Sequence, residues 1–239
     1  MTEKEWLDST DPEEMLVGLD ELGASDRKVR LFMCACCRRI WDLFKDERCR
    51  HAVEIAERYA DGLASDAEIR EAQEVADAVA EETDETELPH FEKLALVGSG
   101  NAAAFTLSDS VGRPMTWEAK TVAEWTVFAL AGSSSVDDSD REAKRLTDFD
   151  DEVSGQCGLL RDLFGNPFRP IALNPACLTP TVIHLAQATY EDWAFDRMPE
   201  LADAFHEAGC DNDAILSHCR APGPHVRGCW VVDLILGKQ

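Results

Sequence analysis

The stretch SDRKVRLFMCACCRRIWDLFK, residues 25–45, decides the fold class of this chain. Its hydrophobic side chains recur at steps of three and four residues, which is the spacing of one face of an α-helix. Ser25 stands directly before the periodic segment, where an N-cap residue is expected. We therefore predict a long amphipathic helix whose basic side chains lie largely on its other side. Its apolar face comprises Val29, Phe32, Met33, Cys36, Cys37, Ile40, Leu43 and Phe44.

Similar helical patterns continue on both sides of this stretch. Residues 47–63 repeat the spacing, and Ser65 with Glu68 has the pattern of a capping box before another helix. Short turns between such helices are typical of an antiparallel bundle. We predict an all-α protein, a multi-helix bundle with a variable acidic middle segment and a buried C-terminal apolar helix. The expected parts are a helical bundle at 1–80, a variable acidic segment of loop and helix at 81–150, and a helical region at 151–239 that packs on the bundle.

The end of the chain combines chemically capable side chains with a strongly apolar run. Residues 218–230 read HCRAPGPHVRGCW, so two histidines, two cysteines and two arginines surround a Pro-Gly-Pro turn. Residues 226–236 are apolar almost throughout, and periodicity alone does not separate a buried helix from a buried strand there. We favour a helix, because no other segment reads as a strand that could pair with it.

Composition and charge restrict the classes of function. The 239 residues include 47 acidic and 23 basic side chains, a formal net charge of −24, and 45% are hydrophobic. Such a chain can bury a core, while its negative field repels nucleic-acid phosphates and anionic membrane surfaces. The polar N-terminus is unlike a secretory signal, and no apolar run is long enough to span a membrane. We expect a cytoplasmic protein with no nucleic-acid or membrane partner.

Three blocks of the sequence resemble a family of bacterial proteins of unknown function. They are residues 25–41, the block RDLFGNPFRP at 161–170, and the segment 218–237 that begins HCR. The resemblance covers both ends of the chain, whereas the middle, about residues 81–150, looks like a variable insertion. It implies a bacterial, cytoplasmic origin and assigns no activity, cofactor or site.

His218, Cys219, His225 and Cys229 form a candidate metal site. If the final segment is helical, His225 and Cys229 lie four residues apart on one face, a spacing at which two ligands can hold one zinc ion. The Pro-Gly-Pro turn would then fold His218 or Cys219 back to complete a tetrahedral shell. In the alternative, the cysteines are buried small hydrophobes and the histidines cap helix ends. The familiar Cys-x-x-Cys spacing is missing here, so both interpretations stay open.

Arg161, Arg169, Arg220 and Arg227 form a candidate anion-binding set. Their Pro-bracketed turns can hold guanidinium groups in a fixed arrangement for carboxylate or phosphate. In so acidic a chain, the alternative is internal pairing with aspartates. Asp233 stands alone in an apolar run, so we expect Arg220 or Arg227 to neutralise its buried carboxylate.

The remaining cysteines carry little functional signal. Cys34 and Cys37 have the spacing of a redox pair, but they fall in mid-helix rather than at a helix start. We predict that most of the nine cysteines are reduced and buried.

Known catalytic motifs are missing from the sequence. It contains no nucleophile elbow, dinucleotide fingerprint or phosphate loop. We therefore expect a non-enzymatic interaction or scaffold protein whose acidic surface meets a basic protein partner. The alternative is a small metal-binding protein or metalloenzyme that uses the C-terminal His/Cys cluster, with zinc as the ion, and whether the chain is an enzyme stays open.

Overall fold

The computed structural model describes residues 1–84, 90–108, 114–133 and 138–238. Over those ranges the chain forms twelve α-helices and three short 3-10 helices, with no strand. The prediction of an all-α, multi-helix protein is therefore confirmed. Parts of the segment that we predicted to be variable, residues 85–89, 109–113 and 134–137, lie outside the described residues.

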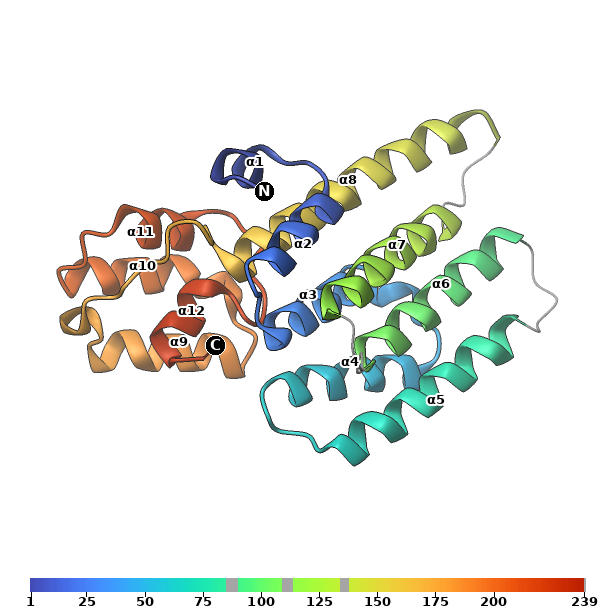
Figure 1. Ribbon diagram of the computed structural model, residues 1–239, viewed down its shortest axis with the longest axis horizontal. Helices are drawn as coiled ribbons and strands as arrows, with labels where there is room; N and C mark the ends of the chain where they lie inside the picture. The colour runs from blue at the N-terminus through green and yellow to red at the C-terminus, as the bar shows by residue number, and fades with distance from the viewer. Residues whose placement is uncertain (85–89, 109–113, 134–137, 239) are drawn as a thin grey trace. The chain divides into compact units, whose positions relative to one another are not determined.

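The helices follow one another with short connections (Figure 1). They are α1 (Glu3–Asp8), α2 (Pro12–Glu21), α3 (Asp26–Arg39), α4 (Glu47–Ala60), α5 (Asp66–Asp84), α6 (His90–Thr106), α7 (Met115–Ser133), α8 (Asp138–Phe164), α9 (Pro180–Glu191), α10 (Met198–Glu207), α11 (Asp213–Arg220) and α12 (Trp230–Leu236). The 3-10 helices are η1 (Trp41–Leu43), η2 (Pro175–Cys177) and η3 (Phe195–Arg197). None of the helices over the described ranges is long and apolar enough to cross a membrane.

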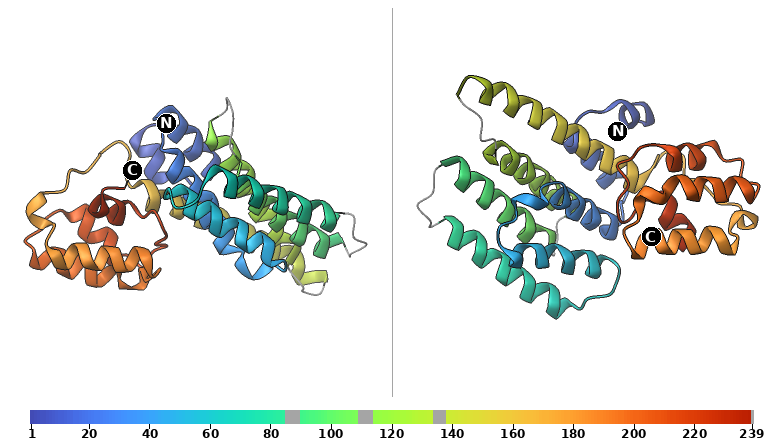
Figure 2. Two further views of the ribbon diagram at one scale, coloured as in Figure 1. Left: turned by 90° about the horizontal axis from the view of Figure 1, so that it is seen from below. Right: turned by 180° about the vertical axis from the view of Figure 1, so that it is seen from behind.

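The chain divides into two compact units. Unit one comprises Met1 and residues 8–157, and unit two comprises residues 2–7 together with residues 158–239. In unit one, α6 packs against α3, α4, α5 and α7, and α3 packs against α4 and α7. The three views agree that α5, α6 and α7 lie side by side (Figures 1 and 2).

Helix α3 forms the centre of unit one. Every residue from 29 to 37 is buried, so the helix is enclosed on all sides rather than on the predicted apolar face alone. Two of its basic residues pair with buried acids while their own side chains stay partly exposed: Arg38 pairs with Glu57 at 2.7 Å and Arg39 pairs with Glu152 at 2.7 Å. The helix ends at Arg39 and is followed by η1, which is earlier than the predicted end.

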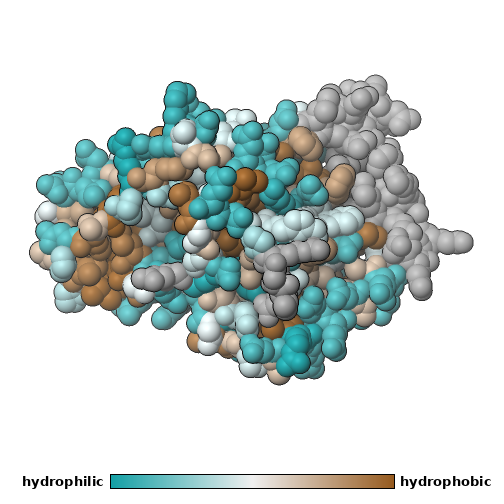
Figure 3. Space-filling view, viewed as in Figure 1, coloured by the Kyte–Doolittle hydropathy of each residue, from teal (hydrophilic) through white to brown (hydrophobic). Residues whose placement is uncertain are grey.

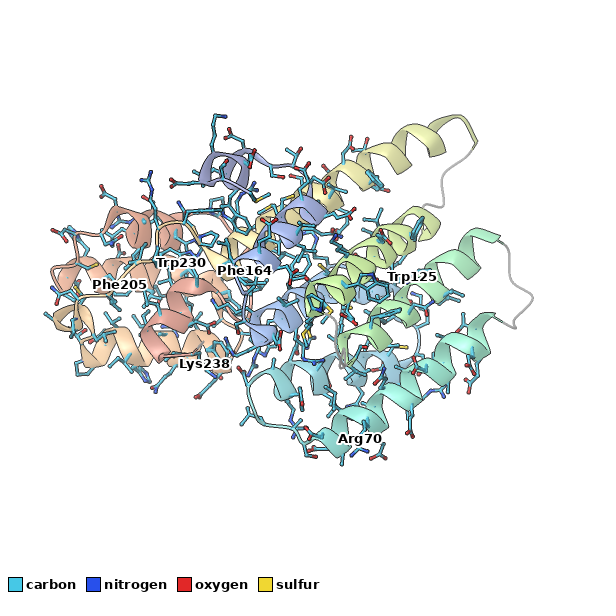
Figure 4. All side chains as sticks on the ribbon, in the orientation of Figure 1. Arg70, Trp125, Phe164, Phe205, Trp230 and Lys238 are labelled. Atoms are coloured by element: carbon cyan, nitrogen blue, oxygen red, sulfur yellow. The ribbon has the colours of Figure 1, made fainter. Side chains whose placement is uncertain are left out.

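Unit two is built around the contacts of α9 with α10 and α12 and of α10 with α11. Its core contains Phe205, which is fully buried, and the closing apolar segment adds Val231, Val232 and Ile235 (Figure 4). In the space-filling view hydrophobic residues also gather at the left over this unit (Figure 3).

The C-terminal apolar run is helical, as predicted, but the helix is shorter than the run. Helix α12 begins at Trp230, and Cys229 occupies its N-cap position in an extended conformation. Residues 221–229 form an irregular loop with a cis peptide bond between Gly223 and Pro224. His225 therefore lies outside the helix, and the expectation that His225 and Cys229 share one helix face is wrong.

Candidate metal centre

Four side chains of unit two converge on one small volume. Asp162, His218, His225 and Cys229 each place a ligand atom within 4.8 Å of the other three. Within the ranges that the structure describes, it is the one group of three or more such side chains found in this arrangement. The ligands come from the last turn of α8, from α11, from the loop after α11 and from the N-cap of α12.

Close packing between α8 and the Pro-Gly-Pro turn positions two of the ligands. A Cβ atom on Gly158 would lie 3.3 Å from Cδ and Cγ of Pro224, so the glycine lets the turn approach the helix. Asp162 follows Gly158 by one helical turn and shares its face. His225 follows Pro224, which brings it directly over Asp162.

Helix α11 supplies His218. Its N-cap, Asn212, accepts hydrogen bonds from the amides of Ala214 and Ile215, which fixes where the helix starts. The imidazole of His218 packs against the Trp230 ring with their centroids 5.1 Å apart. Trp230 therefore restricts the orientation of this ligand.

The Asp162 carboxylate organises the cluster. Its Oδ1 lies 2.8 Å from Nδ1 of His225 and 3.2 Å from Nε2 of His218, and its Oδ2 accepts the Val226 amide at 2.9 Å. Nε2 of His218 also lies 3.1 Å from Sγ of Cys229. Both oxygens of a side chain that is 2% exposed thus have partners, which a buried charge requires.

The electrostatics of the cluster reflect this arrangement. Burial alone would raise the pKa of Asp162, but hydrogen bonds from His218 and His225 hold the pKa of this carboxyl below its usual value. Burial opposes the charged form of His225, yet the hydrogen bond with Asp162 and its charge raise the pKa of the imidazole. Burial, reinforced by the Asp162 charge, raises the pKa of the Cys229 thiol well above its usual range. The cluster therefore holds an ionised carboxylate beside a neutral thiol.

The donor set fits zinc. Imidazole nitrogen, thiolate and carboxylate are the ligands that zinc takes in proteins. With bonds of about 2.0–2.3 Å, tetrahedral ligand atoms lie about 3.3–3.6 Å apart, so shifts of about 1 Å would suffice here. Nε2 of His225 lies 3.2 Å from the Ala221 carbonyl, which can only accept, so Nε2 carries a proton, and Nδ1, which donates to Asp162 in the metal-free cluster, would give up its proton to bind the ion. Metal-bound histidines are commonly oriented in this way by their second nitrogen.

The structure brings together three of the four predicted ligands. His218, His225 and Cys229 belong to the cluster, whereas Cys219 does not, although it is fully buried in α11. Burial, with a contribution from the Asp162 charge, raises the pKa of the Cys219 thiol to about 12. Both histidines contact Asp162, and Nε2 of His225 also lies 3.2 Å from the carbonyl of Ala221, the C-cap residue of α11, as the alternative interpretation predicts for this histidine.

The fourth member of the cluster, Asp162, was not predicted as a ligand. We considered it only as a partner for arginine. A signal was present, because Asp162 is a single acid in the last turn of a helix whose Leu159, Leu160 and Leu163 are all buried. An acid at such a position needs a partner from another segment.

The four candidate arginines contact three different parts of unit two. Arg161 donates to the carbonyl of Trp6 at 3.0 Å, and Arg169 pairs with Glu3 at 2.6 Å, so both contact α1. Arg220 lies 3.7 Å from Asp203 of α10. The guanidinium of Arg227 stacks over the rings of Tyr190 and Trp193, at 4.6 Å and 5.5 Å.

Asp233 and the pair Cys34 and Cys37, which the sequence also singled out, do not belong to the cluster. Asp233 lies in α12 and is 1% exposed, which agrees with a buried carboxylate. Cys34 and Cys37 are buried in α3, and burial raises the pKa of both thiols well above their usual value. All nine cysteines are free and buried, as predicted.

Comparisons with protein-family models, with curated proteins and with solved structures give no match for this chain.

Proposed function

We propose that the protein binds a zinc ion through Asp162, His218, His225 and Cys229. The observation that carries the proposal is the convergence of four ligand atoms within 4.8 Å of one another from four separate segments. Two features of the cluster suit metal binding. The Asp162 carboxylate is ionised, and Nε2 of His225 has the Ala221 carbonyl as its acceptor. If the cluster only fastened the loop to α8 by hydrogen bonds, Asp162 and the two histidines would be enough. The thiol of Cys229 beside His218 would then have no role.

The site has the character of a structural zinc centre. Structural sites are closed by four protein ligands, whereas catalytic sites keep one position for water or substrate. The side chains of Asp162 and His225 are 2% and 6% exposed, and Cys229 is fully buried. His218 is the most exposed ligand, at 17%. An ion here would tie α8, α11 and α12 together and stabilise unit two.

The test is a titration of metal-free, untagged protein with zinc, together with elemental analysis of the protein as purified. We expect one zinc per chain and a rise in unfolding temperature on adding zinc, because a ligand that binds only the folded state stabilises it. Less than about a tenth of an equivalent bound at saturating zinc, with no thermal shift, would overturn the proposal.

A matched pair of cysteine variants locates the site. Cys229 and Cys219 are both fully buried, and burial raises the pKa of both thiols, but the cluster includes Cys229 alone of the two. We expect Cys229→Ala to weaken zinc binding by about 100-fold or more and Cys219→Ala to leave it within a few-fold. Equal effects of the two substitutions would show that zinc binds elsewhere.

A second candidate is a scaffold function in which the acidic surface meets a basic partner. It is favoured by the net charge of −24 and by two exposed aromatic side chains of α7, Trp117 and Phe128, which are 47% and 49% exposed. Eleven residues separate them, so they lie within about 20° of the same helix face. A basic partner bound there would be released at high ionic strength, and Trp117→Ala would weaken its binding. Salt-independent binding, or binding that Trp117→Ala leaves unchanged, would remove this candidate.

A further inference from the structure

Helix α1 is held at the end of α8 by Trp6, a buried and hydrogen-bonded tryptophan. Trp6 is 1% exposed, and its indole Nε1 donates to the carbonyl of Gly165 at 2.9 Å. In return, Nη2 of Arg161 donates to the carbonyl of Trp6 at 3.0 Å. Glu3 adds a contact with Asn166 at 2.8 Å. This short helix is therefore held by the residues that surround Asp162 in the chain.

The same residues support the metal cluster from the other side. Gly165 has a positive φ of 61°, and a Cβ there would lie 3.1 Å from Cγ of Trp230. Trp230 follows the ligand Cys229 and packs against the ring of His218, with centroids 5.1 Å apart. A continuous series of contacts thus leads from Trp6 through Gly165 and Trp230 to His218. In the side-chain view Trp230 and Phe164, the neighbour of Gly165, are labelled close together (Figure 4).

We propose that α1 is a strap whose docking sets the metal affinity of the cluster, an inference that rests on the zinc site proposed above. A docked α1 fixes the last turn of α8, which carries Asp162, and the Trp230 ring, which orients His218. Ligands held in place before the ion arrives bind it more tightly, because less ordering remains to be done on binding. Trp6 is a positioning residue in this scheme and does not touch the ion.

The coupling works in both directions. If docking of α1 raises the binding constant for zinc by some factor, zinc must raise the equilibrium constant for docking of α1 by the same factor. Zinc should therefore slow amide hydrogen exchange in residues 3–8, although these residues supply no ligand.

Two substitutions of Trp6 test the strap in the full chain. Trp6→Phe keeps an aromatic ring and removes the donor to Gly165, while Trp6→Ala removes the anchor altogether. We expect zinc affinity, measured by competition with a chromophoric chelator, to fall about 10-fold in Trp6→Phe and about 100-fold in Trp6→Ala. Cobalt added in place of zinc should give a weaker or shifted thiolate-to-metal absorption band, because the position of Cys229 relative to the other ligands is loosened.

A control separates positioning from general destabilisation. Val182 is fully buried in α9 of the same unit, and α9 supplies no ligand. Val182→Ala should lower the unfolding temperature while leaving the zinc affinity and the cobalt spectrum unchanged.

The outcomes distinguish the strap from the metal site itself. Wild-type protein that binds no zinc would overturn the zinc site. Wild-type protein that binds zinc, with Trp6→Ala matching Val182→Ala in affinity and zinc leaving exchange in residues 3–8 unchanged, would overturn the strap alone.

Discussion

The carboxylate of Asp162 lies 2.8 Å from Nδ1 of His225, 63 positions later in the chain. This contact fastens the loop after α11 to the end of α8. It also sets the protonation of both side chains, since each favours the charged form of the other. The stability of unit two and the zinc binding proposed above therefore depend on the same pair.

Replacing the central carboxylate should destabilise the metal-free protein. In Asp162→Asn the Val226 amide and two histidines lose a charged acceptor in a buried site. Breaking a buried pair by removing one partner costs about 3–5 kcal/mol, and we expect about 3 kcal/mol because His225 can give up its proton. The midpoint and slope of urea unfolding measure the change. Asp203→Asn, whose side chain is 76% exposed, should change stability by less than about 0.5 kcal/mol, and an equal loss in both variants would contradict the role of Asp162.

The Asp162–His225 pair should give the metal-free protein a defined pH dependence. The pKa of Asp162 is lowered from 3.8, so its contribution is present above pH 3.8 and is lost as pH falls through the lowered value. The pKa of His225 is raised from 6.5, so its contribution is present below pH 6.5 and is lost as pH rises through the raised value. Both contributions are complete between pH 3.8 and 6.5.

A chelator-treated comparison of wild type with His225→Gln measures this window. The difference in unfolding free energy between the two proteins should be largest near about pH 5 and smaller near about pH 8.5. A difference that stays constant over this range would show that the charge of His225 contributes nothing. The titration of the many other acids is common to both proteins, so it cancels when one unfolding free energy is subtracted from the other.

Two glycines with left-handed backbone conformations offer a matched test of the Trp230 contact. Gly165 has φ of 61° with Trp230 at 3.1 Å from a built Cβ, whereas Gly209 has φ of 78° and nothing within 4 Å. Gly209→Ala should cost about 1 kcal/mol from backbone strain alone. Gly165→Ala should cost about 1–3 kcal/mol more, because the methyl group must also displace the indole. Equal losses in thermal or urea unfolding would mean that Trp230 moves away freely.

In unit one, Gly155→Ala should disturb a buried ion pair. A Cβ on Gly155 would overlap the guanidinium of Arg39, which pairs with Glu152 at 2.7 Å. Burial outweighs the effect of Arg39 and raises the pKa of Glu152, so this 2% exposed carboxylate depends on its partners. Alanine gains about 1 kcal/mol of helix propensity over glycine, and we expect a net loss of about 1–2 kcal/mol in urea unfolding.

The destabilisation by Gly155→Ala should disappear or reverse when the charge of Glu152 is removed. In a Glu152→Gln background the displaced arginine leaves no buried charge behind, so Gly155→Ala should be neutral or stabilising. A loss of the same size in both backgrounds would instead assign the cost to steric overlap with Arg39.

The helices were largely predictable because they depend on local patterns. The three-four spacing in residues 25–45 and the capping box at Ser65 correspond to a helical segment and a helix start in the structure. Helix α6 was missed, because its run of glycine, alanine and serine gives little amphipathic signal and its neighbours alone make it buried. The end of α3 and the start of α12 each differ from the predicted position by several residues.

The candidate site was predictable in its residue types and not in its assembly. The sequence indicated His218, His225 and Cys229 from their density around a Pro-Gly-Pro turn. The reason given for their proximity was wrong, because a loop and an N-cap place His225 and Cys229 together rather than one helix face. Cys219, equally close in sequence, lies outside the cluster, since its neighbours in α11 direct it into the core.

The sequence by itself determined that this chain is all-helical, where several helices begin, and which short segment holds three of the four clustered side chains. These features follow from periodicity, capping residues and composition, which act over a few residues. Only the tertiary structure decided that Asp162 joins His218, His225 and Cys229, that Arg161 and Arg169 contact α1, and that Trp6 of α1 lies against Gly165. Such contacts depend on how elements far apart in the chain pack, and a buried carboxylate finds its partners only when that packing is complete.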